Sequence, residues 1–178
     1  MLPLLLVIVV VVAAGLVVVI ALRPGKFLIS RSTAIDAPAA VIFPYLSDFQ
    51  KFLAWSPFDK LDPKATRDFS GPASGRGSLY SWDGNRKVGS GSCIITDCKQ
   101  NELVIMRLDF IRPFKCTNIG EFKLISTKTG VELTWSMTGE YNFVMKAFGL
   151  VANMDKVVGG QFAQGLANLK TIAEGQAN

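Results

Sequence analysis

The sequence predicts an α+β domain in which one curved antiparallel sheet packs its apolar face against a long C-terminal helix, with a separate apolar helix in front of the domain. Three observations predict this class. Residues 2–22 carry no charged side chain, residues 66–140 alternate strand-like segments with turn residues, and apolar positions after Asn142 recur every three or four residues. Strands followed by an amphipathic helix are typical of a sheet layer packed on a helix layer.

The first segment, Leu2–Leu22, is 21 residues long and consists mostly of Val, Leu and Ile. At about 1.5 Å per residue it forms a helix about 30 Å long, which matches the hydrocarbon thickness of a bilayer, so we predict a transmembrane helix. One alternative is a buried helix of a soluble core. Another is a signal peptide with an apolar region over Leu2–Val12 and cleavage after Gly15. The run continues past Gly15 and no charged side chain precedes it, which favours an uncleaved anchor.

Basic residues follow the apolar segment closely, at Arg23, Lys26 and Arg31. Because Lys and Arg are retained on the cytoplasmic side, this bias predicts a single-pass membrane protein whose domain lies in the cytoplasm. The link Arg23–Lys26 spans at most about 13 Å, so we expect the domain close to the bilayer. We divide the chain into an anchor (residues 1–23), a linker (24–26) and one domain (27–178).

The charge distribution limits the classes of molecule that the domain is expected to bind. The chain has 19 Lys and Arg against 14 Asp and Glu, a formal net charge of +5, and the two signs are interspersed. This pattern predicts no nucleic-acid partner; the excess of positive charge serves either solubility or contact with an anionic lipid surface. The chain has no histidine, which excludes Ser-His-Asp and Cys-His catalysis and histidine zinc sites.

The cysteines Cys93, Cys98 and Cys116 are odd in number and lack CxxC spacing. They predict neither a disulfide framework nor a zinc site, and they suit a reducing compartment. We expect no metal, no cofactor and no catalytic residue. Any chemistry would have to rest on Asp, Glu, Lys, Tyr or Cys, so the composition favours a binding domain over an enzyme.

The domain is predicted to begin with a strand over Phe27–Ile35, where apolar and polar residues alternate. Asp36 and Pro38 then predict a helix start, with Asp36 as the N-cap and Pro38 near the first helical position. We expect a short or kinked helix, interrupted by Pro44 and ending near Asp48, and a second short helical turn after it.

Further strands are predicted between clusters of Gly, Pro, Asp and Asn, which favour turns. They cover Thr66–Ser70, Ser78–Trp82, Val88–Asp97, Leu103–Ile111, Lys115–Ser126 and Val131–Glu140. Their spacing is typical of an antiparallel meander. Alternation is clearest in the last strand, where Val131, Leu133, Trp135 and Met137 share one face.

One long amphipathic helix is predicted from Asn142 to the end of the chain. Its apolar positions are Phe148, Val151, Met154, Val158, Phe162, Leu166, Leu169 and Ile172. Gly159 and Gly160 each cost about 1 kcal/mol relative to alanine in a helix interior. Either the helix bends at these glycines or a bulky neighbour needs the space. A sheet curled around such a helix leaves a tapering cavity between them.

Several motifs of the domain resemble those of one superfamily. They are Asp36-Ala37-Pro38, Ser47-Asp48-Phe49, Trp55-Ser56-Pro57-Phe58, residues 71–82, Val88-Gly89-Ser90-Gly91, residues 108–114, and Phe162 with residues 165–170. Over residues 27–172 the chain resembles the SRPBCC superfamily, and within it membrane-anchored bacterial proteins labelled polyketide cyclase/dehydrase-like or START-like. The resemblance implies a helix-grip fold that binds hydrophobic ligands such as lipids, sterols or polyketides, or that serves as a cyclase or co-chaperone module.

The candidate ligand-binding residues lie on the walls of the expected cavity. Tyr80 and Trp82 share one face of their strand and serve either the cavity or sheet packing. Met106 and Met137 suit a cavity that adapts to flexible chains, and Asn118 is the candidate polar group inside it. The predicted ligand-binding set is Tyr80, Trp82, Met106, Leu108, Phe110, Asn118, Met137, Phe148 and Phe162.

Other notable residues have two interpretations each. Gly89 and Gly91 leave one strand face without side chains, which either opens room for a ligand or marks a bend. Arg107 and Asp109 alternate with apolar neighbours, so we expect them on the solvated outer face of the sheet rather than in an acid-base site. Cys93 is expected to be a small core residue and not a nucleophile.

The sequence thus predicts a membrane-tethered, monomeric domain that binds a hydrophobic small molecule or lipid between sheet and helix, with the lipid bilayer as its other partner. One alternative is a cyclase or dehydratase that uses a carboxylate or tyrosine as acid or base; a carboxylate with a raised pKa inside the cavity would support it. The other is a protein-interaction module, which a large apolar patch on the outer sheet would favour.

Overall fold

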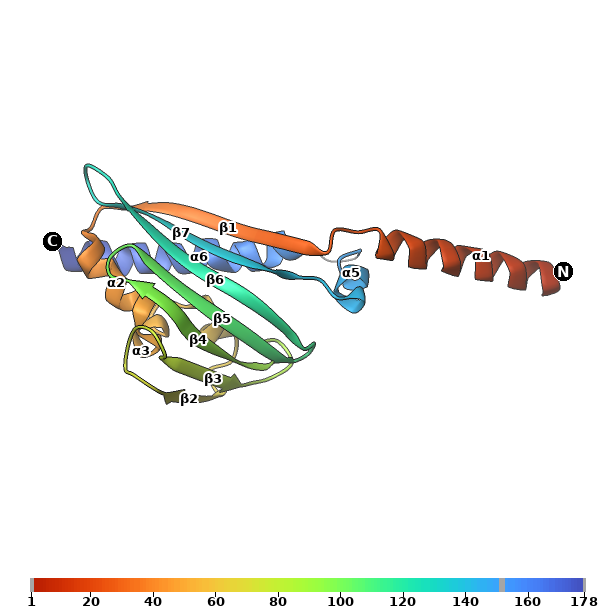
Figure 1. Ribbon diagram of the computed structural model, residues 1–178, viewed down its shortest axis with the longest axis horizontal. Helices are drawn as coiled ribbons and strands as arrows, with labels where there is room; N and C mark the ends of the chain where they lie inside the picture. The colour runs from red at the N-terminus through yellow and green to blue at the C-terminus, as the bar shows by residue number, and fades with distance from the viewer. Residues whose placement is uncertain (1, 151–152, 178) are drawn as a thin grey trace.

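The computed structural model describes residues 2–150 and 153–177. Its helices are α1 (Leu2–Ala21), α2 (Ala39–Ser47), α3 (Phe49–Phe52), α4 (Pro57–Leu61), α5 (Phe143–Phe148) and α6 (Met154–Ala177). Its strands are β1 (Lys26–Ile35), β2 (Thr66–Ser70), β3 (Leu79–Asp83), β4 (Ser90–Lys99), β5 (Leu103–Arg112), β6 (Cys116–Ser126) and β7 (Val131–Glu140). α6 runs along one face of the sheet and α1 projects from one end of the domain (Figure 1). This arrangement confirms the predicted α+β class.

All the described strands form one antiparallel sheet in the order β1-β7-β6-β5-β4-β3-β2. β2 to β7 are a meander, as predicted, and β1 pairs with β7 at the far edge from Lys26↔Glu140 to Ile35↔Val131. The pairing of β4 with β5 shifts register between Ser90 and Gly91 and again between Ile95 and Asp97. Such irregularities bend a strand and increase its twist, which helps the sheet to curve around α6.

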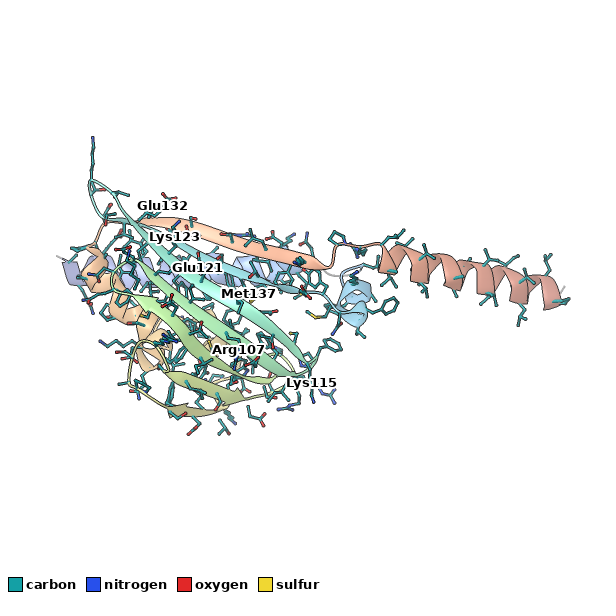
Figure 2. All side chains as sticks on the ribbon, in the orientation of Figure 1. Arg107, Lys115, Glu121, Lys123, Glu132 and Met137 are labelled. Carbon is teal, nitrogen blue, oxygen red and sulfur yellow. The ribbon has the colours of Figure 1, made fainter. Side chains whose placement is uncertain are left out.

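The predicted strands are correct to within two residues at each end, and β2 and β7 match at both. In β7 the predicted inner face is buried, at Val131, Leu133, Trp135 and Met137. The outer face of the sheet carries charged side chains, among them Arg107, Glu121, Lys123 and Glu132 (Figure 2). These charges are interspersed with exposed apolar side chains, among them Leu28 and Ile119.

The N-cap predicted at Asp36 is wrong. α2 begins at Ala39, and its N-cap is Pro38, which makes no side-chain capping bond. Asp36 instead joins the ends of the domain, because its backbone N–H donates to Glu174 Oε1 at 2.8 Å. This bond lowers the pKa of Glu174. α4 was not predicted either, although Pro57 in its first turn is a start signal.

The single C-terminal helix predicted from Asn142 is also wrong, because α5 ends at Phe148 and α6 begins at Met154. Polar side chains mark two helix starts: Asn142 accepts a hydrogen bond from the N–H of Met145, and Asn153 from that of Lys156. These caps compete with a continuous helix. The predicted apolar position Val151 lies outside the described residues.

Gly159 and Gly160 lie inside one uninterrupted helix, α6. A Cβ on Gly159 would lie 2.1 Å from a guanidinium nitrogen of Arg31, whereas one on Gly160 would meet nothing within 4 Å. The interpretation that a bulky neighbour needs the space is therefore confirmed at Gly159. The guanidinium group of Arg31 also forms an ion pair with Asp155 at 3.0 Å, which links β1 to the first turn of α6.

α1 is long and apolar enough to cross a membrane over Pro3–Ala21. Its described side chains are exposed except near Ile20, so it is not a helix of the domain core. This finding excludes the soluble-core alternative for the segment.

Candidate functional site

A cavity of about 370 Å³ lies between the concave face of the sheet, α6 and the α3–α4 segment, and its lining is mostly apolar. Pockets that hold drug-sized ligands measure about 300–1,000 Å³. If each methylene-sized group takes about the 30 Å³ of a water molecule, the cavity holds about a dozen such groups. That volume suits one aliphatic chain or a small ring system.

Aromatic rings form the inner part of the cavity, which we call the closed end: Phe52, Trp135 and Phe162 line it, and Trp55 packs behind them. Trp135 stacks on Phe162 with centroids 4.0 Å apart, and Trp55 meets Trp135 edge-on at 5.4 Å. The indole N–H of Trp55 donates to a backbone carbonyl of α2 at 3.0 Å. A Cβ on Gly165 would lie 3.0–3.2 Å from Trp135, Trp55 and a proline ring, so this glycine lets α6 approach closely.

The other part of the cavity, which we call the mouth, is bordered by Lys87, Arg112, Phe114, Met145 and Met154. Lys87 and Phe114 are exposed residues of the loops that follow β3 and β5, and Arg112 is the exposed last residue of β5. These loops, α5 and the start of α6 lie at the end of the domain from which α1 projects (Figure 1). The exposed lining thus lies on the α1 side of the domain.

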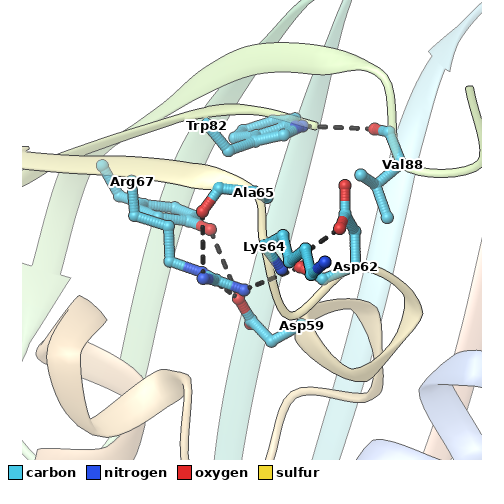
Figure 3. A network of polar contacts seen from close by, with 8 residues as sticks. Asp59, Asp62, Lys64, Ala65, Arg67, Trp82 and Val88 are labelled. Carbon is cyan, nitrogen blue, oxygen red and sulfur yellow. Dashed lines mark hydrogen bonds and ion pairs between the residues drawn. The ribbon is translucent and has the colours of Figure 1, made fainter. Parts of the chain in front are cut away.

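A polar network occupies the cavity wall beside α4 and β2 (Figure 3). Arg67 Nε donates to Asp59 Oδ1 at 2.8 Å, and the hydroxyl of Tyr80 donates to the same oxygen at 3.5 Å. The other guanidinium nitrogens of Arg67 donate to the carbonyl oxygens of Ala65 and Asp62, both at 3.1 Å. With only 20% and 15% of their side chains exposed, Arg67 and Asp59 form a largely desolvated ion pair.

The protonation of Tyr80 follows from this setting. Burial, reinforced by the negative charge of Asp59, raises the pKa of Tyr80 to about 12. The hydrogen bond from Arg67 to Asp59 raises the pKa of Arg67 in turn. At neutral pH the network therefore presents a neutral hydroxyl and a paired carboxylate, which suit hydrogen bonding to a ligand better than proton abstraction.

Asn118 is a buried polar residue on the cavity wall, 4% exposed. Its amide Nδ2 contacts Met137 Sδ at 3.7 Å, and its Oδ1 has no hydrogen-bond partner in the described protein. Leaving a buried carbonyl oxygen without a partner costs about 1–3 kcal/mol. The oxygen lies over Gly139 of β7, where a Cβ would clash with it.

Eight of the nine predicted ligand-binding residues line the cavity: Tyr80, Trp82, Met106, Leu108, Phe110, Asn118, Met137 and Phe162. Phe148 does not line it, because it lies on α5 with 49% of its surface exposed. Tyr80 and Trp82 stack on each other with centroids 5.7 Å apart, so sheet packing and cavity lining are combined there.

The prediction missed Asp59 and Arg67. Asp59 belongs to α4, which was not predicted. Its role as an ion-pair partner depends on its contact with Arg67 of β2. Arg67 carried a signal: it shares a strand face with Phe69, and a charge next to an aromatic residue on an inner face requires a partner.

Three other predictions are tested by contacts near the cavity. The space over Gly91 is filled by the Trp82 ring, and Gly89 has φ +66° against the backbone of Arg112, so the bend is confirmed and the opening for a ligand is wrong. Burial raises the pKa of the Cys93 thiol, as expected of a core residue. Asp109 pairs with Arg107 at 2.8 Å on the outer face, as predicted.

Within residues 2–150 and 153–177, no group of three or more Cys, Asp or Glu side chains is placed to hold a metal ion. The Asp59 carboxylate is the acidic group of the polar network in Figure 3 that contacts both Arg67 and Tyr80. The chemistry available in the cavity is therefore apolar contact, ring stacking and a few hydrogen bonds.

Fold and cavity together define a helix-grip domain with an internal apolar site. The chain belongs to the family described as polyketide cyclase / dehydrase and lipid transport, whose model matches residues 26–174. This family lies within the SRPBCC superfamily, as the sequence motifs indicated. A search of curated protein sequences gave no match.

Solved structures share the fold at low sequence identity. Protein CV1439 from Chromobacterium violaceum is 12% identical with a TM-score of 0.59, and the match covers 85% of this chain and 99% of that one. The di-domain ARO/CYC StfQ from the steffimycin biosynthetic pathway is 13% identical with a TM-score of 0.62, over 86% of this chain and 52% of StfQ. The Aha1 dimer from Colwellia psychrerythraea is 18% identical with a TM-score of 0.56, over 83% and 96%.

Proposed function

We propose that the protein binds one hydrophobic small molecule or single-chain lipid in the cavity between its sheet and α6, while α1 tethers it to a membrane. The observation that carries the proposal is the apolar cavity of about 370 Å³, closed at one end by aromatic rings. The family description, which names lipid transport, supports the same ligand class.

The polar groups of the cavity narrow the class of ligand. Asn118 offers an unpaired carbonyl oxygen, and Tyr80 offers a neutral hydroxyl. Both are surrounded by apolar lining, so they favour a ligand with one or two hydroxyl or carbonyl groups over a pure hydrocarbon. A ligand with several charges would leave some of them unpaired in this cavity, which is costly.

The tether is supported by the length and composition of α1 and by the basic residues that follow it. Under the positive-inside rule, Arg23, Lys26 and Arg31 favour a domain on the cytoplasmic side. Two measurements test this part: the intact mass of the mature protein, and the location of a reporter fused after Asn178. Cleavage after Gly15, or a reporter outside the cytoplasm, would overturn the tether or its orientation.

Ligand binding is tested with 1-aminoanthracene, a small uncharged three-ring fluorescent probe that matches the cavity volume, and the full chain in phospholipid nanodiscs. Leu108→Trp, which fills the cavity from β5, should abolish the fluorescence rise that accompanies probe binding. Ile119→Trp is the matched control, since Ile119 is 41% exposed on the outer face of the neighbouring strand. The proposal fails if the wild type does not bind the probe, or if both variants bind it equally.

A second function, cyclase or dehydratase chemistry, is favoured by the position of Asp59, Arg67 and Tyr80 on the cavity wall. Their mutual hydrogen bonds argue against it, since the carboxylate is committed to Arg67 and the phenol is a weak acid. Turnover of a polyketide-like substrate that Tyr80→Phe abolishes, with binding retained, would favour this function over simple binding.

A further inference from the structure

The end of the domain nearest α1 exposes apolar side chains that the fold does not cover. On α5, Phe143, Val144 and Phe148 are 49–51% exposed, and Leu150 just after it is 43% exposed. Ile111 near the end of β5 and Phe114 in the loop between β5 and β6 are 55% and 41% exposed. Water is a poor solvent for so many neighbouring apolar groups, so they indicate a contact surface.

α5 is fixed to the end of α1. The ammonium group of Lys146 donates to the carbonyl oxygen of Ala21 at 3.1 Å, and Arg23 Nη1 donates to the carbonyl oxygen of Lys146 at 3.4 Å. A lysine that binds a last-turn carbonyl also stabilises the helix dipole of α1. These bonds hold α5 at the level where the chain leaves the apolar helix.

We propose that α5 and the β5–β6 loop form a membrane-docking surface, whose partner is the bilayer that α1 crosses. α5 contacts the C-terminal end of α1 and exposes apolar side chains beside it, so a bilayer that covers α1 to its last turn also reaches α5. A short helix with its apolar side chains in the headgroup and acyl boundary is the geometry of an interfacial segment.

Charge favours an anionic lipid surface. Lys115 at the tip of the β5–β6 loop (Figure 2) and Lys26 at the start of β1 are exposed at this end. Among the acidic groups nearby, Asp83 pairs with Arg112 and Asp155 with Arg31, and Glu140 lies opposite Lys26 in the β1–β7 pairing. Each basic residue near an anionic leaflet contributes about 1 kcal/mol.

The docking surface surrounds the mouth of the cavity. Met145 on α5 and Phe114 in the loop both line the cavity and both belong to the segments placed against the bilayer. A hydrophobic ligand therefore exchanges between cavity and membrane without crossing bulk water. This last step rests on the proposed function, whereas the docking itself does not.

Photocrosslinking in the full chain tests the docking. Benzoylphenylalanine replaces Phe148 or Phe114 in separate proteins, which are reconstituted in vesicles of phosphatidylethanolamine and phosphatidylglycerol and irradiated. The control position is Ile125, which is equally exposed at 48% but lies at the opposite end of β6. Intact mass should show lipid adducts at both test positions in several-fold excess over position 125.

Equal adduct yields at all three positions, or adducts to a second copy of the chain in place of lipid, would overturn the docking surface. Lipid adducts without probe binding would leave docking intact and contradict the proposed function; probe binding without adducts would do the reverse. As a second readout, Val144→Ser with Phe148→Ser should slow transfer of 1-aminoanthracene from vesicles several-fold and leave its affinity in nanodiscs unchanged. Unchanged transfer would contradict exchange through this surface.

Discussion

The closed end of the cavity and its mouth are built from different kinds of side chain. Stacked rings form the closed end, where Trp135 and Phe162 lie 4.0 Å apart. Flexible or exposed side chains form the mouth, among them Met145, Met154 and Phe114. Aromatic rings have few rotamers and large contact areas, whereas methionine repacks readily. The closed end therefore fixes the shape of the cavity, and the mouth adapts to the ligand that enters it.

The difference explains how one layer of side chains serves stability and binding together. Gly165 brings α6 close to the sheet at the closed end, and the caps at Asn142 and Asn153 break the helix before it would cover the mouth. A single helix from residue 142 onward would have lacked the separate segment α5. The break thus creates both the mouth and the surface proposed to meet the membrane.

The largest expected loss of stability comes from a substitution that disrupts the packing at the closed end. Trp135→Ala removes a ring that contacts Phe52, Trp55, Phe122 and Phe162, and should lower the free energy of unfolding by about 3–5 kcal/mol. Met145→Ala at the mouth should cost less than about 1 kcal/mol, because its side chain is partly exposed and free to be replaced by lipid. Denaturant titration of the full chain in nanodiscs, followed by tryptophan fluorescence or far-UV dichroism, measures both. Equal losses would show that the two ends do not differ in rigidity.

The sequence predicted the fold because its signals are local and strong. Alternation in β7 and the turn residues between strands set the meander, and the apolar period after residue 153 set α6. Two of the errors in the helices have a common cause: Asn142, Asn153 and Asp36 are all potential caps, and which of them caps a helix depends on tertiary contacts. The Asp36 carboxylate accepts from the hydroxyl of Thr129 and does not cap α2, whereas the two asparagines cap their own helices.

The cavity was predicted less completely than the fold. Strand alternation identified the sheet residues, such as Met106 and Asn118, because the concave face follows from the pleat. The pairing of Asp59 with Arg67 and the position of Phe148 could not be predicted in this way. Each depends on how a short helix is placed against the sheet, and no local pattern encodes that placement.

An intermediate effect tests the polar wall between the two ends. Asn118→Leu replaces a buried amide that has an unpaired oxygen, so stability should be unchanged or higher. Wild type should bind dodecanol more tightly than its methyl ether by about tenfold, the value of one hydrogen bond of about 1.4 kcal/mol, and the variant should lose this preference. Displacement of 1-aminoanthracene measures both affinities. A preference that survives in the variant would place the ligand hydroxyl elsewhere, with Tyr80 as the next candidate.

The smallest expected effect is a difference in how stability depends on pH between a tyrosine of the inner wall, Tyr80, and one of the mouth, Tyr141. The pKa of Tyr80 is raised to about 12, against about 10 for tyrosine in an unfolded chain. As the pH rises above about 10, the unfolded chain releases this proton while the folded chain keeps it, so the free energy of unfolding falls between pH ~10 and ~12 and is unaffected below. Tyr80→Phe carries no such proton, so its unfolding midpoint should fall less steeply than that of wild type from pH 9 to about 11.

Tyr141→Phe is the control from the mouth: burial also raises the pKa of Tyr141, but its ring is partly exposed beside Phe27, so the change in slope should be smaller. Parallel curves for wild type and Tyr80→Phe would mean that Tyr80 is as solvated as the residues of the mouth.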